Sequence, residues 1–313
     1  MPPRRFVHPT VLAWYALVGV SACERRQPPT HIDSAAIPVE STPVGMATAE
    51  HASEWSRSAG PALLVQGETR DEAIVLLPAA DDSSSVARLR ALGNEGAEVT
   101  MFGRDGARFT GRLGVPAQTA DTDVECRVWP LRDVNGAGTD NTWAIGFIGG
   151  ETAPLALDSV NVLSARDSMA LAAEASRLAS AVTVVAPPSF QGLRFTAHDI
   201  RRFEVSPGVQ AIVAHLIRKV NQEANPQEEQ TLLIAERDSG VTTGPYQLVY
   251  AERTHGPEET TTTSEVIGGV RIAGRPTLIV ARDAEEGVAY TLLERTGPRQ
   301  WRIRWTSART RCG

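Results

Sequence analysis

Between residues 194 and 306, short strand-like segments follow one another and are separated by turn residues. Connections that contain pairs such as Gly244-Pro245 and Gly297-Pro298 interrupt them, as expected where glycine and proline end regular structure. The segments cover 194–204, 209–220, 230–237, 246–254, 263–273, 276–283, 287–295 and 300–306. Because strands joined by short turns pair with their neighbours in antiparallel, the sequence predicts an antiparallel β-meander over residues 191–313.

An internal repeat lies within this meander. Residues 231–238 (TLLIAERD) are echoed by residues 277–283 (TLIVARD), and residues 252–257 (ERTHGP) are echoed by residues 294–298 (ERTGP). A period near forty residues with about four strands is also typical of a propeller blade. We therefore expect duplicated hairpins within one sheet or small barrel, with a degenerate β-propeller as the alternative. Chance similarity between strand-and-turn segments is a further alternative.

The region from residue 59 to residue 190 mixes strand and helix patterns. Its expected strands cover 62–66, 73–77, 99–102, 107–113, 124–129 and 142–148. An expected helix covers 86–92, behind a cap at residues 82–85. A longer helix is predicted over 167–182, behind a capping box at Ser164–Asp167. The fold class that we predict is therefore α+β, predominantly antiparallel β, with an α+β part before the meander.

The N-terminus has the order of features found in an export signal. Arg4 and Arg5 precede an apolar stretch, Phe6 to Val20, which is shorter than the roughly 20 apolar residues that span a bilayer. The stretch ends in Val20-Ser21-Ala22-Cys23. Such a segment is typical of a signal peptide that is removed after export, here residues 1–22.

Val20-Ser21-Ala22-Cys23 resembles the lipobox of bacterial lipoprotein precursors. The resemblance implies cleavage before Cys23 and a diacylglycerol on its sulfur, with palmitate among the acyl chains, because two or more chains give stable membrane anchoring. It also implies a location in the bacterial cell envelope, on the periplasmic face or the cell surface. An ordinary signal peptide with an incidental cysteine is the alternative.

Residues 23–58 are predicted to form the lipidated cysteine and a disordered tether. The segment contains Pro28, Pro29, Pro38 and Pro43 and has no sustained apolar period, a composition that cannot bury enough apolar surface to offset the entropy of ordering. Without residues 1–22 the chain has 29 basic and 37 acidic residues, a net charge of −8. Because nucleic-acid binding requires a basic surface, we expect no nucleic-acid partner.

Two further cysteines, Cys126 and Cys312, remain if Cys23 carries lipid. The cell envelope is oxidising, so an even pair there is expected to form a disulfide. A bridge between Cys126 and Cys312 would tie the chain end to the first half of the fold. Two buried free thiols are the alternative.

No common catalytic or metal-binding motif is present in the sequence. The three histidines beyond the tether, His198, His215 and His255, stand apart in the sequence without ligand-like neighbours, so we expect them to be surface or strand residues. One segment, Asp133 to Asn141, resembles the calcium loops of FG-GAP propeller repeats, which would imply a calcium site spanning Asp133 and Asp140. Ala137 replaces the central acid of that pattern, and a plain polar turn is therefore favoured over a calcium ligand set.

Three aromatic residues near the C-terminus, Tyr290, Trp301 and Trp305, raise the question of sugar stacking. Trp301, Ile303 and Trp305 alternate with arginines, so the pattern predicts all three on one buried face of a strand. We expect no catalytic residue, cofactor or metal. The favoured function is a non-catalytic binding or scaffolding module of a lipid-anchored envelope protein, with a protein or glycan partner. An envelope hydrolase, or a lipoprotein that binds a small ligand or carbohydrate, is the alternative.

Overall fold

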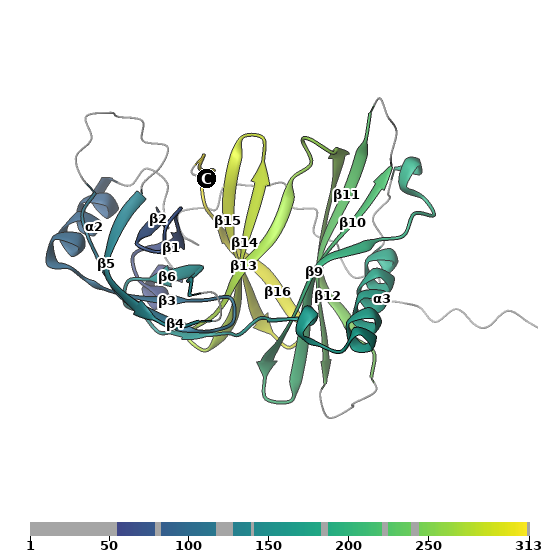
Figure 1. Ribbon diagram of the computed structural model, residues 1–313, viewed down its shortest axis with the longest axis horizontal. Helices are drawn as coiled ribbons and strands as arrows, with labels where there is room; N and C mark the ends of the chain where they lie inside the picture. Colours follow the sequence, from purple (N-terminus) through teal and green to yellow (C-terminus); the bar gives the residue numbers. More distant parts are fainter. Residues whose placement is uncertain are drawn as a thin grey trace, which may run out of the picture. The chain divides into compact units, whose positions relative to one another are not determined.

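The first strands form a small closed barrel (Figure 1). The computed structural model describes residues 55–78, 83–116, 128–138, 141–182, 187–220, 225–238 and 244–311. All barrel pairings are antiparallel, in the order β1-β2-β5-β4-β3-β6. The strands are β1 (Leu63–Gln66), β2 (Glu72–Leu76), β3 (Glu98–Phe102), β4 (Arg108–Leu113), β5 (Val128–Gly136) and β6 (Ile145–Phe147), and helix α2 (Ser83–Glu95) contributes Leu89 to the barrel core.

Side chains fill the barrel interior and also cover part of its outside. Alternate residues of β2 enter two different cores: Ala73 and Val75 face the interior, whereas Ile74 and Leu76 belong to a second cluster outside the barrel. This division explains the unbroken apolar run in β2, because successive side chains of a strand point to opposite faces and here both faces are buried.

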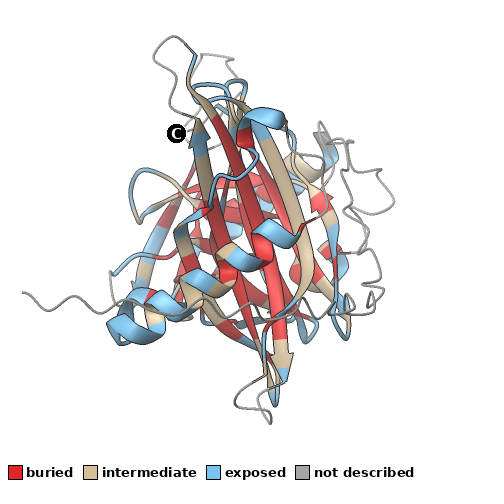
Figure 2. Cartoon of the chain, turned by 90° about the vertical axis from the view of Figure 1, so that its right-hand side faces the viewer, coloured by how far each residue is buried: buried red, intermediate tan, exposed pale blue. Residues whose placement is uncertain are grey.

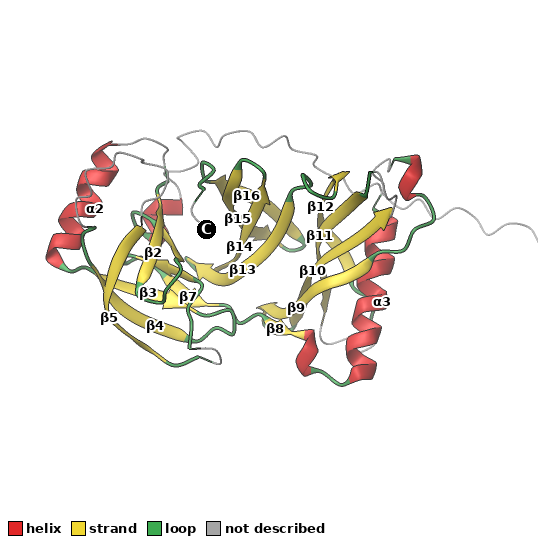
Figure 3. Cartoon of the chain, turned by 45° about the horizontal axis from the view of Figure 1, so that its top comes forward, coloured by secondary structure: helices red, strands yellow, loops and turns green. Residues whose placement is uncertain are grey.

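The second half of the chain forms two five-stranded antiparallel sheets. We name them the middle sheet, in the order β16-β15-β14-β13-β7, and the outer sheet, in the order β12-β11-β10-β9-β8. Figure 3 shows the short strands β7 (Thr152–Pro154) and β8 (Asp158–Ser159) at their edges. The middle sheet has β13 (Thr263–Ile272), β14 (Arg275–Ala284), β15 (Gly287–Gly297) and β16 (Gln300–Thr306), and the outer sheet has β9 (Thr196–Ser206), β10 (Val209–Val220), β11 (Gln227–Asp238) and β12 (Gln247–Pro257).

The middle sheet is buried on both faces. Leu278 and Val280 of β14 pack in a core shared with β9, β10 and β11 of the outer sheet. Ile279, between them, packs with Leu63 and Phe147 of the barrel. The layers therefore follow one another as barrel, middle sheet and outer sheet.

Two consecutive glycines in β13 allow this close layering. A Cβ atom on Gly268 would lie 3.0 Å from the Ile145 side chain of the barrel, and one on Gly269 would lie 2.8 Å from the Leu155 carbonyl oxygen. Both approaches are tight for a side chain. The backbone of β13 can thus approach its neighbours only because these two positions lack side chains.

Helix α3 (Ala165–Ala181) covers the far face of the outer sheet, and Figure 2 shows it in front of buried strands. Ser164 caps the helix: its hydroxyl accepts a hydrogen bond from the Asp167 backbone N–H and donates one to the Asp167 carboxylate. Ala175 and Leu178 are buried against the sheet. Short 3₁₀ turns, η1 (Val160–Val162) and η2 (Pro188–Phe190), flank the helix.

Ion pairs of the buried Glu236 and the partly buried Glu252 join the two sheets. Glu236 of β11 accepts hydrogen bonds from the Arg295 guanidinium at 2.8 and 2.9 Å and from the Trp301 indole at 2.7 Å. Glu252 of β12 accepts from Arg282 of β14. Since a buried charge requires a partner, these pairs specify how the sheets meet.

The structure confirms a predominantly antiparallel α+β fold. The predicted strands over 209–220 and 300–306 match β10 and β16. The meander does not continue as one sheet, however, because no pairing joins β12 to β13 among the described strands. The repeated segments fall in hairpin β11–β12 of one sheet and hairpin β14–β15 of the other.

The described residues include no helix that is long and apolar enough to cross a membrane. The predicted signal peptide, Cys23 and tether residues 24–54 lie outside the described residues. Cys126 and Cys312 do so as well. Residues 55–58, also predicted to be disordered, are helical, and Trp55 packs in the core beside the barrel, so the prediction for these four residues is wrong.

Candidate functional site

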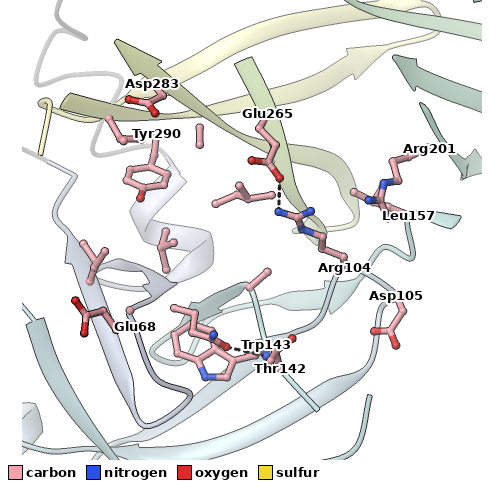
Figure 4. A pocket seen from close by; sticks show the side chains of 18 of the residues that line it. Glu68, Arg104, Asp105, Thr142, Trp143, Leu157, Arg201, Glu265, Asp283 and Tyr290 are labelled. Carbon is pink, nitrogen blue, oxygen red and sulfur yellow. Dashed lines mark hydrogen bonds and ion pairs between the residues drawn. The ribbon is translucent and has the colours of Figure 1, made fainter. Parts of the chain in front are cut away.

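A large cavity lies between the barrel and the middle sheet, and we call it the cleft. Its volume is about 1340 Å³. One wall consists of β1, β2 and the residues before β6, and the other consists of β13, β14 and β15 on the face that carries Ile267 and Tyr290. Figure 4 shows side chains from both walls and from the β3–β4 turn pointing into the space between them.

Carboxylates predominate among the charged residues of the cleft. Its lining contains three arginines, Arg104, Arg201 and Arg311, and six acids: Glu68, Glu72, Asp105, Asp158, Glu265 and Asp283. Arg104 contacts Glu265 at 2.5 Å across the two walls, and Arg201 contacts Asp199, outside the cleft, at 2.9 Å. The cleft is therefore net negative and favours a ligand with positive charge.

The base of the cleft is apolar. Ile74 of the barrel and Ile267 and Tyr290 of the middle sheet belong to the core that the two layers share, and Val288 packs against it. An apolar base with polar groups around it is the usual composition of a binding site. It offers contact area to the uncharged parts of a ligand.

Tyr290 places a hydroxyl group within this apolar region. The residue is 6% exposed, and its hydroxyl has no hydrogen-bond partner among the described residues, although it lines the cleft. Burial and the nearby negative charge of Asp283 raise the pKa of Tyr290, so the phenol is protonated at neutral pH. It can donate a hydrogen bond to a ligand and accept another.

Trp143 forms a fixed part of the wall. Its indole N–H donates to the Arg70 carbonyl oxygen at 2.7 Å, and its backbone N–H donates to Gln66 Oε1 at 3.1 Å. The side chain is 2% exposed. Because its only donor is already used, Trp143 shapes the cleft and does not supply a hydrogen bond to a ligand.

The first half of the calcium-loop-like segment, Asp133 to Asn141, is part of a strand and not a loop. Asp133 to Gly136 belong to β5, where Asp133 has a φ of 53° at a register shift against β4. The Asn135 side chain donates to the Asp133 carbonyl oxygen. Asp140 lies outside the described residues, and the described part of the chain holds no group of three or more metal-ligating side chains.

The predicted alignment of Trp301, Ile303 and Trp305 on one face is wrong. A register shift against β15 pairs Trp305 with Leu292 and Ile303 with Leu293, so Arg304 is an extra residue. Trp301 therefore enters the core between the two sheets, whereas Trp305 enters the core beside the barrel. Both indoles are buried and bonded to protein groups, which leaves neither ring free to stack on a sugar.

Sequence reasoning missed most residues of the cleft. Its acids come from six separate places in the chain, from Glu68 to Asp283, with no motif between them. Only the fold brings them together. The sequence pattern points to the aromatic ring of Tyr290 as a candidate for stacking. In the fold it is the hydroxyl group of Tyr290 that is available to a ligand in the cleft.

No protein-family model, curated protein or solved structure matches this chain. The function must therefore be argued from the cleft itself.

Proposed function

We propose that this chain is a lipid-anchored protein of the bacterial cell envelope, and that its folded part is a non-catalytic module that binds an extended cationic ligand in the cleft. The observation that carries the proposal is the hydroxyl of Tyr290, which has no partner among the described residues and opens into a cleft where acids outnumber arginines six to three. A protein or peptide segment with basic side chains has the matching charge.

The size of the cleft supports an extended ligand. Its volume of about 1340 Å³ exceeds the roughly 300–1,000 Å³ of sites for drug-sized molecules. The apolar base between the acids would contact the uncharged side chains of such a segment. Lysine or arginine side chains would reach Glu68 on one wall and Asp283 on the other.

A labelled peptide of alternating lysine and alanine residues tests the proposal, with a glutamate–alanine peptide for comparison. We expect only the basic peptide to bind, with an affinity that falls as salt screens the charges. Asp283→Asn combined with Glu68→Gln should weaken binding at least ten-fold, measured by fluorescence anisotropy. Tyr290→Phe should weaken it about five-fold, the effect of one hydrogen bond.

The matched control replaces two exposed acids outside the cleft, Glu259→Gln and Glu285→Gln. This variant changes the net charge of the protein by the same amount. If it loses as much affinity as the cleft variant, the attraction is general and the cleft is not the binding site.

The lipid anchor is supported by the charged, apolar and small residues that precede Cys23 in the order of a lipobox. The tether would hold the binding module at a distance from the membrane. Expression of the precursor in a bacterial host, followed by intact-mass measurement of the membrane fraction, tests this. A product without acyl mass, or one cut elsewhere than before Cys23, would contradict the anchor.

A disulfide between Cys126 and Cys312 remains part of the proposal. Its support is the oxidising compartment, together with the described residues closest to each cysteine: Val128 and Arg311 line the same cleft. Titration of thiols in the unfolded, non-reduced protein isolated from the envelope is the test. Two free thiols would exclude the bridge.

The origin of the two sheets belongs to the proposal as well. We propose that hairpins β11–β12 and β14–β15 derive from one duplicated hairpin, because similar residues occur at similar places in both. The alternative of a degenerate propeller is unconfirmed. Related sequences in which the two hairpins are more alike would support duplication, and relatives in which they diverge completely would argue for chance.

A further inference from the structure

A second, smaller cavity lies between the two sheets and next to the cleft. Its volume is about 210 Å³. The outer sheet lines it with His198, Asp199 and His215, and the middle sheet lines it with Thr263 and Glu265. The two imidazole rings lie 5.2 Å apart between centroids, at an angle of 72°.

An irregularity in strand pairing brings the two histidines together. His215 of β10 pairs with Asp199 of β9, and the next residue, Leu216, pairs with Ala197, which leaves His198 as an extra residue. A bulge of this kind redirects a side chain and occurs often next to functional sites. Here His198 and Asp199, although consecutive, both line the cavity with His215.

A chain of hydrogen bonds determines which nitrogen of His215 carries the proton. The amide nitrogen of Gln230 donates to the Glu228 carboxylate and to the Thr263 hydroxyl. The Gln230 oxygen must therefore accept, and it lies 2.9 Å from His215 Nε2. Nε2 is thus the protonated nitrogen, and Nδ1 of His215 keeps a free lone pair.

His215 is enclosed between the two sheets, and the residue is 5% exposed. An imidazole whose single N–H is held by an acceptor and whose other nitrogen keeps its lone pair is the form in which histidine binds metals. Gln230 holds His215 in this form before any metal arrives.

His198 supplies the second nitrogen. Its side chain is exposed, and neither of its ring nitrogens has a hydrogen-bond partner among the described residues. A first-row metal lies about 2.1 Å from each imidazole nitrogen, so two rings that share one ion have centroids within roughly 6.5 Å of each other. The observed spacing of 5.2 Å is within this limit.

We propose that His198 and His215 bind one divalent transition-metal ion of the zinc and copper class. Imidazole nitrogen is a preferred ligand of these ions. The described residues hold no group of three or more metal-ligating side chains, so water would occupy the remaining coordination positions. The cavity adjoins the cleft of the proposed peptide ligand and shares Arg104, Arg201, Thr263 and Glu265 with it, but neither histidine lines the cleft.

The test uses the full mature chain in detergent, without a polyhistidine tag and with thiols blocked. His31 and His51 are both replaced by alanine, so that His198, His215 and His255 are the histidines left in the mature chain. Zinc is titrated by calorimetry, and copper(II) is followed by electron paramagnetic resonance. We expect one equivalent of either metal and a copper spectrum with coupling to two imidazole nitrogens.

His198→Ala should weaken metal binding at least ten-fold and reduce the copper coupling to one nitrogen. Because His198 is exposed, the variant should fold, and its thermal unfolding without metal checks this. The matched control His255→Ala removes another exposed histidine and should bind as the parent does. Absence of saturable binding by the parent, or equal affinity of His198→Ala and the parent, would overturn the site.

Discussion

The middle and outer sheets share one topology but are covered differently. Each has four long strands in sequence order and one short edge strand from earlier in the chain. The barrel packs on the far face of the middle sheet with apolar side chains. The far face of the outer sheet is covered by α3 over only part of its area, with Ala175 and Leu178 in contact.

An ionic cluster covers part of the outer-sheet face that α3 does not cover. Glu229, with no exposed side-chain surface, contacts Arg218 at 2.5 Å and Arg253 at 3.0 Å. Both guanidiniums also lie over the Phe195 ring, 4.5 and 5.3 Å from its centroid. The comparison shows that a sheet face can be closed either by a second layer or by a helix plus a paired ionic cluster.

The ionic cluster should give the largest effect when it is broken. Glu229→Gln would leave Arg218 and Arg253 buried without a counter-charge, which typically costs about 3–5 kcal/mol of unfolding free energy. Urea denaturation followed by tryptophan fluorescence measures the loss. Glu285→Gln, in an exposed turn of the middle sheet, is the control and should change stability by less than about 0.5 kcal/mol. A loss of less than about 1 kcal/mol for Glu229→Gln would show that the cluster contributes little.

The corresponding substitution on the middle sheet removes apolar contact instead. Ile279→Ala leaves a cavity between β14 and the barrel and should cost about 2–4 kcal/mol. Adding Arg253→Met removes one of the guanidiniums left unpaired in Glu229→Gln and should recover part of that loss, whereas it should recover none of the loss in Ile279→Ala. Equal recovery in the two variants would mean that the two faces are not stabilised differently.

The spacing between barrel and middle sheet can be tested by adding one methyl group. Gly268→Ala places a Cβ atom 3.0 to 3.2 Å from the Ile145 side chain, and overpacking of this kind costs about 1–3 kcal/mol. Adding Ile145→Val removes one methyl group from the contacting side chain and should recover part of the loss. If the double variant is no more stable than Gly268→Ala alone, the contact with Ile145 is not the cause.

The smallest effect is expected at the helix that covers the outer sheet. Ser164→Ala removes the hydroxyl that caps α3 and should lower the unfolding free energy by about 1 kcal/mol. Ser164→Thr keeps a hydroxyl that can both accept from the Asp167 backbone N–H and donate to the Asp167 carboxylate, and it should be close to the unchanged protein. A full loss in Ser164→Thr would assign the effect to another contact of Ser164.

The sequence was sufficient to predict local structure but not the layers. Strand and helix patterns predicted β10, β16 and the cap of α3, because these depend on neighbouring residues. The division into two sheets occurs between β12 and β13, which do not pair with each other. The two faces of β14 carry similar apolar residues, although one face packs on the barrel and the other on the outer sheet. Which layer each face contacts depends on tertiary contacts and cannot be predicted from the local pattern.

The candidate sites show the same limit. The acids of the cleft have no sequence signature, because each comes from a different element. The sequence could have predicted that His198 and His215 lie near each other. The turn at Pro207-Gly208 joins two predicted strands, and their antiparallel pairing places these residues nearly opposite each other. The bulge that turns both side chains toward one cavity could not be predicted, and neither could the extra residue Arg304, which separates Trp301 from Trp305.

The contact between Trp55 and Trp305 has a consequence for how the protein folds. The rings lie 5.2 Å apart, and the Trp305 indole donates to the Pro78 carbonyl oxygen at 2.8 Å, so the last strand is part of the core that contains the first described residues. Contacts between distant parts of a chain slow folding. The core beside the barrel cannot close until β16 has been synthesised, and quenching between these two indoles would report when this core closes.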